Sequence, residues 1–461
     1  MNRTAVVCTS IASLAFMGAA ALLTAGPLDP PAGPVAPSYK TLSDVEPRTA
    51  ISLANTPGDA DSVYRISQPG SYYLTRNIVG QAGKSAIEIA ASGVTIDLCG
   101  FEVGDSGIAN RPAIIASGSL SAITVRNGSV RWKGGGGIAL SGGTGARVEH
   151  VLVDGCGGTG ITVGTAAVVS GCTVVASNGA GILAVSQARV EQCSTSQNAG
   201  TGVSTSQWST IIGCVSTANA GNGFSVGFSS TVEGCSSSGN TGAGFTMGPG
   251  SSAKGCSAGQ NALDGFTSET GCSLTDCTAS FNDNDGFTCF NSTLTNCAAY
   301  ENQLVGFAIS GRATSCIAVG NGQNGFASNS GLIADSCSAS SNSGDGFAIG
   351  DDSVLTRCRG IGNSGDGAQI GTDSLVEGCV FNTNTAGYGI LVTGSANRIQ
   401  NNQVASNLVG IGCTGTDSFV VGNSARANTT NYSLGTNEYG QIVVNPGAGF
   451  TTSNPWMNVA Y

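Results

Sequence analysis

Charged side chains are scarce in this sequence, and positive ones are the scarcest. Only 10% of the 461 residues are Asp, Glu, Lys or Arg, and the formal net charge at pH 7 is −10. Between Arg189 and Arg312 the single positive side chain is Lys254. Because nucleic acids and anionic membranes are bound by basic surfaces, this balance argues against both as partners. It also leaves the middle of the chain with little means of binding any polyanion.

Aromatic, histidine and methionine residues are also few. Aromatics make up 6% of the chain, which holds one histidine and four methionines. Long stretches rich in Glu, Lys, Leu and Arg are absent, which disfavours a solenoid of helices. What the sequence has instead is 71 glycines and 17 cysteines in a uniform composition. One repetitive body is therefore favoured over several domains.

The N-terminal residues have the pattern of an export signal. Arg3 precedes an apolar run that ends near Leu23 and is followed by small residues. Residues 1–25 are therefore predicted to be a cleaved signal peptide, with an uncleaved membrane anchor as the alternative. Residues 26–38 hold five prolines and are predicted to form an extended linker. We expect a secreted or cell-envelope (periplasmic) protein with no membrane span after signal removal.

A repeating unit with the consensus SxVxxCxAxxNxxxGF occupies most of the chain. Its cysteines recur every 21 residues, apart from one spacing of 20 and one of 19. Each unit has three short alternating patches separated by Asn, Gly, Ser and Asp, which is strand and turn chemistry. One unit is therefore predicted to be one turn of a three-sided coil, whose successive turns pair as parallel strands about 4.8 Å apart. The cysteines of the repeat are Cys172, Cys193, Cys214, Cys235, Cys256, Cys277, Cys297, Cys316, Cys337, Cys358 and Cys379.

Stacking in register predicts further columns of identical side chains. A buried aromatic column, continued by Ile390 and Ile411, is expected to consist of Phe224, Phe245, Phe266, Phe287, Phe307, Phe326 and Phe347. Small residues are expected where the coil is narrow, at Ala258, Ala279, Ala299, Ala318 and Ala339. Asparagines that bond along their own column are expected at Asn198, Asn219, Asn240, Asn261, Asn282, Asn302, Asn321, Asn342, Asn363 and Asn384.

The same frame extends beyond the cysteines. We expect Cys99, Asn127 and His150 to occupy the cysteine column upstream, and Asn402 and Asn423 to occupy it downstream. This gives fifteen coil steps. The predicted organisation is an N-terminal cap with the first coils over residues 39–98, a parallel β-helix over 99–430 and a C-terminal cap over 431–461, so the fold class is all-β.

Over about residues 85–430 the units resemble the parallel β-helix repeats of the pectin lyase-like superfamily. The segments GSYYLTRNI and VTIDLCGF resemble the first coils of secreted bacterial members, and NPWMNVAY resembles a closing cap. The resemblance implies a single right-handed parallel β-helix. It implies no single activity, because that superfamily contains polysaccharide lyases and hydrolases, adhesins and members without known activity.

The cysteines are expected to be buried free thiols. Neighbouring Cβ atoms in a stacked column lie about 4.8 Å apart, which is too wide for an ordinary disulfide. A uniform column also offers no tetrahedral metal site. Cys289 and Cys413 are predicted to lie in the core beside the aromatic column. His150, in the cysteine column, is interpreted as structural, with a catalytic or ligand role as the alternative.

Carboxylates are the candidate catalytic groups. One predicted column, just before the Gly-Phe turn, holds Asp264, Asp285, Asp345 and Asp366, and a second holds Asp352 and Asp373. Carboxylates on adjacent turns, about 5 Å apart at the backbone, could act on one glycosidic bond or bind calcium, although Asp is also an ordinary turn residue. The densest mixed-charge patch, where a site is expected first, consists of Asp345, Asp351, Asp352, Arg357, Arg359, Asp366 and Asp373.

The sequence Gly350-Asp351-Asp352 is similar to the GDD of β-helical polygalacturonases, but the histidine-containing motif of that family is missing. We therefore do not assign the catalytic roles of that family to residues of this chain. We expect a surface, structural or adhesive protein without an identifiable catalytic site or cofactor, whose candidate partner is a polysaccharide or a cell-envelope glycan. The alternative is a carbohydrate-active hydrolase or lyase with its site near Asp345 to Asp373 and calcium as its candidate ion.

Overall fold

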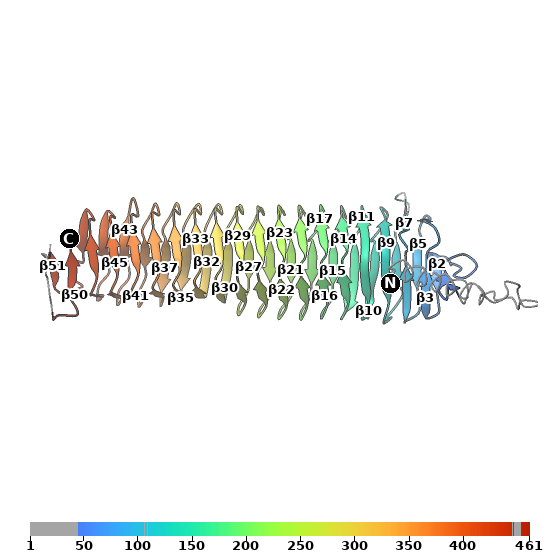
Figure 1. Cartoon of the computed structure of the whole chain (residues 1–461), viewed down its shortest axis with the longest axis horizontal. Coiled ribbons are helices and arrows are strands. Elements are labelled where there is room, and N and C mark those ends of the chain that lie inside the picture. Colours follow the sequence, from blue (N-terminus) through green and yellow to red (C-terminus); the bar gives the residue numbers. More distant parts are fainter. Residues whose placement is uncertain (1–44, 106, 108, 445, 447–452) are drawn as a thin grey trace, which may run out of the picture. The chain divides into compact units, whose positions relative to one another are not determined.

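The computed structural model describes residues 45–105, 107, 109–444, 446 and 453–461. The predicted signal peptide (residues 1–25) and linker (residues 26–38) lie outside the described residues. Residues Arg48–Tyr461 form one compact unit, in which short strands of successive turns stack along one axis (Figure 1). Every pairing between its named strands is parallel, and the pairings follow the chain order of the turns except at the C-terminal end, where Asn458–Ala460 lies between Ser424–Arg426 and Ile442–Val444. This confirms the predicted all-β coil.

Each turn contributes a strand to each of three sheets. The first sheet comprises β1 (Thr49–Ala50), β3 (Gly70–Tyr73), β6 (Val94–Asp97), β9 (Thr124–Arg131), β11 (Arg147–Asp154), β13 (Val168–Ser170), β16 (Arg189–Glu191), β19 (Thr210–Ile212), β22 (Thr231–Glu233), β25 (Ser252–Lys254), β28 (Ser273–Thr275), β30 (Phe287–Thr295), β32 (Phe307–Thr314), β35 (Leu332–Asp335), β38 (Val354–Thr356), β41 (Leu375–Glu377), β44 (Arg398–Gln400), β47 (Phe419–Val421) and β50 (Glu438–Tyr439).

The second sheet continues from the first, and β9 and β11 run through both. Its other strands are β4 (Ile78–Val79), β7 (Glu102–Gly104), β14 (Thr173–Val175), β17 (Ser194–Ser196), β20 (Val215–Thr217), β23 (Ser236–Ser238), β26 (Ser257–Gly259), β29 (Thr278–Ser280), β31 (Ala298–Tyr300), β33 (Ile317–Val319), β36 (Ser338–Ser340), β39 (Arg359–Ile361), β42 (Val380–Asn382), β45 (Gln403–Ala405), β48 (Ser424–Arg426), β52 (Asn458–Ala460) and β51 (Ile442–Val444).

The third sheet closes each turn, and β30 and β32 continue from it into the first sheet. Its other strands are β2 (Ser62–Ile66), β5 (Ser85–Ile89), β8 (Ile114–Ala116), β10 (Ile138–Thr144), β12 (Ile161–Thr165), β15 (Ile182–Ala184), β18 (Val203–Thr205), β21 (Phe224–Val226), β24 (Phe245–Met247), β27 (Phe266–Ser268), β34 (Phe326–Ser330), β37 (Phe347–Asp351), β40 (Ala368–Ile370), β43 (Tyr388–Val392), β46 (Val409–Cys413) and β49 (Thr430–Ser433).

The chain bends between sheets at three corners, which we name after their buried polar or sulfur column. The cysteine corner joins the first sheet to the second, the asparagine corner joins the second to the third, and the serine corner joins the third to the first. In one turn, Gln187, Gln192 and Gln197 stand at the serine, cysteine and asparagine corners with φ of 61°, 53° and 54°. A left-handed residue at each corner reverses the in-and-out alternation and lets three-residue strands follow one another.

The described part of the coil makes about 19 turns of about 21 residues, against the fifteen steps expected from the sequence. The additional turns lie at the two ends. Before Cys99 the core is built from aliphatic residues such as Ile66, Ile87 and Ile96, which are completely buried. After Asn423 the strand Asn458–Ala460 pairs with Ser424–Arg426. These end turns lack the cysteine and phenylalanine columns that mark the repeat, and a count of those columns therefore omits them.

The cysteine column is confirmed from Cys172 to Cys379, and Asn402 and Asn423 continue it as predicted. The backbone N–H of Cys379 donates to Oδ1 of Asn402 over 2.9 Å, and that of Asn402 donates to Oδ1 of Asn423 over 2.9 Å. Asn458 extends the column by one further turn, because its Oδ1 accepts the N–H of Asn423 at 3.0 Å.

Upstream, the predicted column was wrong by one residue. Glu149 pairs with Ser170 and Leu152 with Thr173, so Val151 lies opposite Cys172 and takes its buried place. His150 is instead exposed, with φ of 52°. Asn127 and Cys99 stand at the same kind of exposed corner position, with φ of 61° and 52°. The shift arises because these residues fill the left-handed position that directly precedes the inward-pointing one.

All sixteen cysteines among the described residues are free thiols, as expected, and all but Cys99 are buried. Within the column the thiols serve as hydrogen-bonding groups of the corner. Sγ of Cys214 donates to the carbonyl of Ile212 over 3.4 Å and accepts the N–H of Cys193 over 3.4 Å. Cys289 and Cys413 lie in the core, as predicted, and burial raises the pKa of each thiol to about 12.

The asparagine column forms the predicted ladder inside its corner. Oδ1 of Asn342 accepts both the backbone N–H of Asn321, over 3.0 Å, and its side-chain Nδ2, over 2.9 Å. Nδ2 of Asn342 in turn donates to Oδ1 of Asn363 over 2.9 Å and to the carbonyl of Ala318 over 3.3 Å. Each amide thus satisfies the backbone of a buried bend, where water cannot reach.

The phenylalanine column stacks face to face from Phe224 to Phe347. Neighbouring rings have centroids 4.7–4.9 Å apart and planes within 5–7° of parallel. The next turn places Ala368 in the column, followed by the predicted Ile390 and Ile411. The predicted alanine column is also buried, on the second sheet opposite the rings. The core is therefore a set of in-register columns that bury large apolar area along the whole coil.

Candidate functional site

Two turns near the middle of the coil are shorter than the rest. Cys277 comes eleven residues after Phe266. In contrast, Cys297 comes ten residues after Phe287, and Cys316 comes nine residues after Phe307. The missing residues therefore all belong to the serine corner. There β30 and β32 run from the third sheet into the first without a break, and their register shifts between Cys289 and Ser292.

The shortened corner leaves a depression of about 420 Å³ on the surface. It lies over β30, β32 and β34, near the middle of the stack in Figure 1. Its walls consist of Thr288, Phe290, Ala308, Ile309, Ser310, Ala327, Ser328, Asn329 and Ser330. Because the next turn regains its full corner, Asn329 and Ser330 stand beyond the shortened edge and bound the depression on that side.

The lining combines an aromatic ring with uncharged hydrogen-bonding groups. The side chain of Phe290 is 59% exposed, so an apolar ring faces the depression and the solvent. Around it stand hydroxyls and one amide, and none of the lining residues is ionisable. Such a surface can pack against a flat ring with apolar C–H faces while hydrogen-bonding polar groups at the ring's edge. Sugar rings have this character.

Three of the sequence-predicted site residues lie beside this depression. Asp351 pairs with Ser330 of its wall, and Asp352 and Asp373 follow at the serine corner with φ of 55° and 53°. All three are exposed. Oδ1 of Asp351 accepts the N–H of Thr372 over 2.7 Å, so this carboxylate also supports the corner backbone. The structure therefore brings Asp351, Asp352 and Asp373 together at one corner.

Asp345 and Asp366 lie elsewhere, at the asparagine corner. Oδ1 of Asp345 accepts the N–H of Asp366 over 2.7 Å, and Oδ1 of Asp366 accepts the N–H of Tyr388 over 2.7 Å. Burial, with a smaller contribution from Asp345, raises the pKa of Asp366 to about 6. Burial also raises the pKa of Asp345. These carboxyls form the predicted column, in which each one caps the backbone of the following turn.

Arg357 and Arg359 lie apart from both groups. Arg357 stands at the cysteine corner with φ of 54° and forms an ion pair with Asp335. Arg359 begins β39 on the second sheet. The predicted mixed-charge patch is therefore divided among three corners and a sheet face rather than gathered in one site. Within the described ranges, no three His, Cys, Asp or Glu side chains are placed to hold a metal ion.

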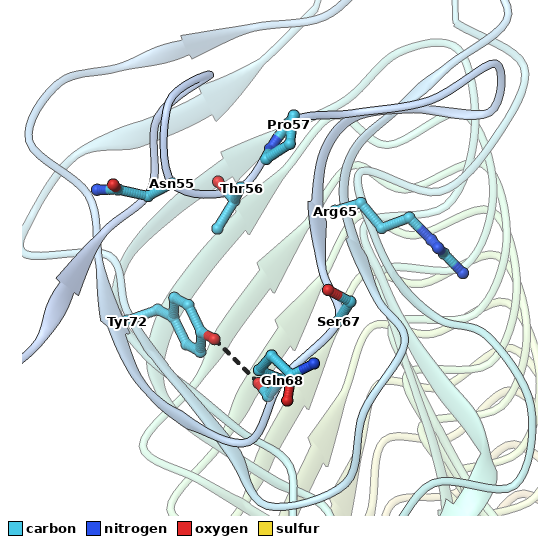
Figure 2. Close-up of a pocket in the computed structure, with 7 residues that line it drawn as sticks. All are labelled: Asn55, Thr56, Pro57, Arg65, Ser67, Gln68 and Tyr72. Carbon is cyan, nitrogen blue, oxygen red and sulfur yellow. Dashed lines mark hydrogen bonds between the residues drawn. The ribbon is translucent and has the colours of Figure 1, made fainter.

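A second hollow, of about 130 Å³, lies in the N-terminal turns (Figure 2). The hydroxyl of Tyr72 donates to the carbonyl of Gln68 over 2.9 Å at its floor. The Arg65 side chain points away from Tyr72 and is engaged by Asp59 at 3.3 Å and Glu88 at 3.5 Å. Arg65 is the one charged residue that lines the hollow, and it is already paired within the chain, so the hollow offers no free charge for a ligand.

Sequence analysis did not identify the depression around Phe290, although a signal was present. The spacings of 20 and 19 mark the two short turns, and comparing the Phe-to-Cys intervals assigns the loss to one corner. What the spacing cannot reveal is that the lost residues uncover Phe290 and leave a hollow. That outcome depends on how the neighbouring corners project.

The sequence matches a family model described as a right handed beta helix region, over residues 65–215 and 312–430. A search of curated proteins finds no match. Among solved structures, the chain is similar to a mannuronan C-5 epimerase A-module from Azotobacter vinelandii, with 13% identity, a TM-score of 0.31 and coverage of 80% of this chain and 90% of that one.

Two phage proteins are also similar in structure. The tailspike of E. coli bacteriophage HK620, solved in complex with a pentasaccharide, shares 12% identity at a TM-score of 0.38 and covers 79% of this chain and 77% of its own. Gene product 12 of bacteriophage phi29 shares 11% identity at a TM-score of 0.32, covering 86% and 68%. At these values none of the three bears on the activity of this chain. No helix in the part of the chain that the structure describes is long and apolar enough to cross a membrane.

Proposed function

We propose, from the premise that this chain belongs to the right-handed β-helix family, that the protein is an exported surface or adhesive scaffold that contacts glycans. The observation that carries the proposal is the depression at the serine corner, where the exposed ring of Phe290 stands among hydroxyls and an amide. Aromatic and neutral polar groups in a hollow suit sugar rings better than they suit ions or peptides rich in charge.

The rest of the molecule supports a scaffold. Its core columns are satisfied by hydrogen bonds and apolar contacts from turn to turn, so a surface feature is held on a rigid support. Localisation outside the cytoplasm is part of the proposal and rests on the signal-like composition of residues 1–25. The stable display of one glycan-contacting corner requires no catalysis.

A binding screen tests the proposal. The purified protein is applied to a broad glycan array, and any binding is repeated with Phe290→Ala and with Phe281→Ala as the matched control. Phe281 is similarly exposed, at 52%, but stands at the asparagine corner. We expect Phe290→Ala to weaken binding and Phe281→Ala to leave it unchanged. Absence of binding across the array, or equal binding by both variants, would contradict the proposal.

A second candidate function is cleavage of a polysaccharide, and the position of Asp351, Asp352 and Asp373 beside the depression favours it. Carboxylates on adjacent turns lie at a separation that glycosidases use. A turnover assay on any glycan that binds, with and without calcium, decides between the two functions. Cleavage that is lost in Asp352→Asn and Asp373→Asn, with binding retained, would establish the enzyme.

A further inference from the structure

The serine corner carries a second exposed aromatic feature upstream of the depression. The rings of Trp208 and Phe228 meet edge to face with centroids 5.4 Å apart and planes at 80°. They are 51% and 41% exposed. Trp208 follows β18 and Phe228 follows β21, so both lie on the corner that Phe290 occupies in a later turn. Packed against each other, the two rings form a fixed apolar surface rather than two mobile side chains.

The two aromatic features are separated along the coil axis by a short stretch of corner. Phe228 and Phe290 belong to turns three steps apart, or roughly 14 Å at the ordinary spacing of strands. The corners between them consist of the half-buried Gly248 and the exposed Pro249 and Gly250, then the exposed Glu269, Thr270 and Gly271. No large side chain stands in the way. An extended chain of a few sugar rings could therefore touch both features at once.

The charges along this corner select against a charged ligand. From Trp208 to Ser330 the exposed corner residues include one charged side chain, Glu269. Beyond Ser330 come the exposed carboxylates Asp351, Asp352 and Asp373. Arg312 is an exposed cation just beyond the shortened corner, and it lies in the field of the Asp335 carboxylate. A polyanion would therefore be repelled at one end and would find little attraction along the rest. An uncharged polysaccharide is not repelled by these carboxylates.

We propose that the ligand is an uncharged, extended polysaccharide that lies along the serine corner, with Phe290 and the Trp208–Phe228 pair as its two anchors. This inference rests on the proposed glycan-contacting function and adds the class, direction and length of the ligand. Contact at two anchors makes affinity depend on length, because a fragment that reaches both gains the second contact without a second loss of translational freedom.

The test measures affinity for neutral β-glucan and galactomannan fragments of graded length, with polygalacturonate as the anionic probe. The variants are Phe290→Ala, the double variant Trp208→Ala/Phe228→Ala and the control Phe281→Ala. We expect wild-type affinity for a neutral series to rise with length and then level off. The double variant should lose about tenfold for long fragments and little for short ones. Phe290→Ala should weaken both.

The outcomes separate this inference from the proposed function. If Phe290→Ala abolishes binding while the double variant binds long fragments as the wild type does, the two-anchor inference is overturned and the glycan site remains. Tighter binding of polygalacturonate than of any neutral fragment also overturns the inference alone. If neither neutral nor anionic glycans bind, the result contradicts both the proposed function and the two-anchor inference. Unchanged melting temperatures establish that the variants are folded, as expected for exposed side chains.

Discussion

Phe381 lies edge to face against Phe347, with ring centroids 6.2 Å apart and planes at 77°, at the point where the phenylalanine stack ends. In the turn after Phe347, Ala368 takes the place of a phenylalanine in the column. On the second sheet, Gly360 and then Phe381 continue the alanine column. The ring that is absent from the third sheet at Ala368 is thus replaced by the ring of Phe381 from the second sheet. The two sheets exchange volume, and the core stays filled.

This exchange predicts strong coupling between Ala368 and Phe381. Ala368→Phe alone should destabilise the protein, because its ring meets that of Phe381. Phe381→Ala alone should cost about 3–5 kcal/mol through the cavity that it leaves. The double variant should recover much of the loss, since the new ring would extend the stack. Denaturant unfolding of all four proteins measures the coupling, and additive effects would contradict this packing.

The asparagine ladder predicts a large effect from one buried amide. Asn342→Ala deprives the N–H of Asn321 of its acceptor and leaves one Nδ2 hydrogen of that residue unpaired. At about 1–3 kcal/mol for each buried donor left unpaired, the loss should be about 2–6 kcal/mol. Thermal or urea unfolding measures it. The control is Gln323→Ala on an exposed corner, and an equal effect of the control would show that the ladder contributes nothing special.

Asp366 predicts a pH dependence of stability with a definite sign. Its pKa of about 6 lies above the ordinary 3.8, so the folded state holds the proton more tightly than the unfolded state. The stability from this proton is complete below 3.8 and is lost as the pH rises through about 6. Asp366→Asn keeps an acceptor for Tyr388 and cannot ionise. It should raise the melting temperature at pH 7 and lose that advantage near pH 4.

The equivalent amide already occurs in this column, because Oδ1 of Asn324 accepts the N–H of Asp345 over 2.7 Å. An asparagine therefore fits the corner. Asp373→Asn, at the exposed serine corner, serves as the control and should shift the melting temperature little at either pH. A gain for Asp366→Asn that is the same at pH 4 and pH 7 would rule out the ionisation as its cause.

The burial of the thiols predicts selective labelling. In native protein only Cys99 among the described cysteines should react with an alkylating reagent, whereas all should react after unfolding. Partial desolvation of its sulfur and the neighbouring carboxylate of Asp97 raise the pKa of the exposed Cys99, so its labelling should be slow at pH 7 and faster at higher pH. Peptide mapping by mass spectrometry identifies the sites. Native labelling within the cysteine column would contradict the structure.

The sequence predicts the middle of this fold well, because stacked turns must repeat the side chains that touch. Cys, Asn and Phe recur at the regular spacing of the repeat, and the structure confirms all three columns. The ends are less visible, since aliphatic side chains such as Ile66 and Ile87 stack without a distinctive residue. His150 was misplaced for a related reason. A left-handed corner accepts several residue types, and none of them marks the inward position beside it.

The candidate site was only partly accessible to sequence reasoning. Asp352 and Asp373 were correctly predicted to share a column, because their separation follows the repeat. The same reasoning grouped them with Asp345 and Arg357, which lie close in sequence but at other corners. Within a coil, residues ten apart can face opposite directions, so proximity along the chain says little about proximity in space. Phe290 was not predicted as a site residue, because its exposure results from the shorter serine corners of two turns.

The irregular turns have a consequence for how the chain finds its pairing. From Phe224 to Phe347 the columns are so alike that a strand displaced by one whole turn would meet nearly the same neighbours. Such a slip carries little penalty within the uniform region. It becomes costly where Phe381 must meet Ala368 and where the two short corners must lie together. These exceptions to the repeat therefore specify which turn pairs with which, a task that perfect regularity could not perform.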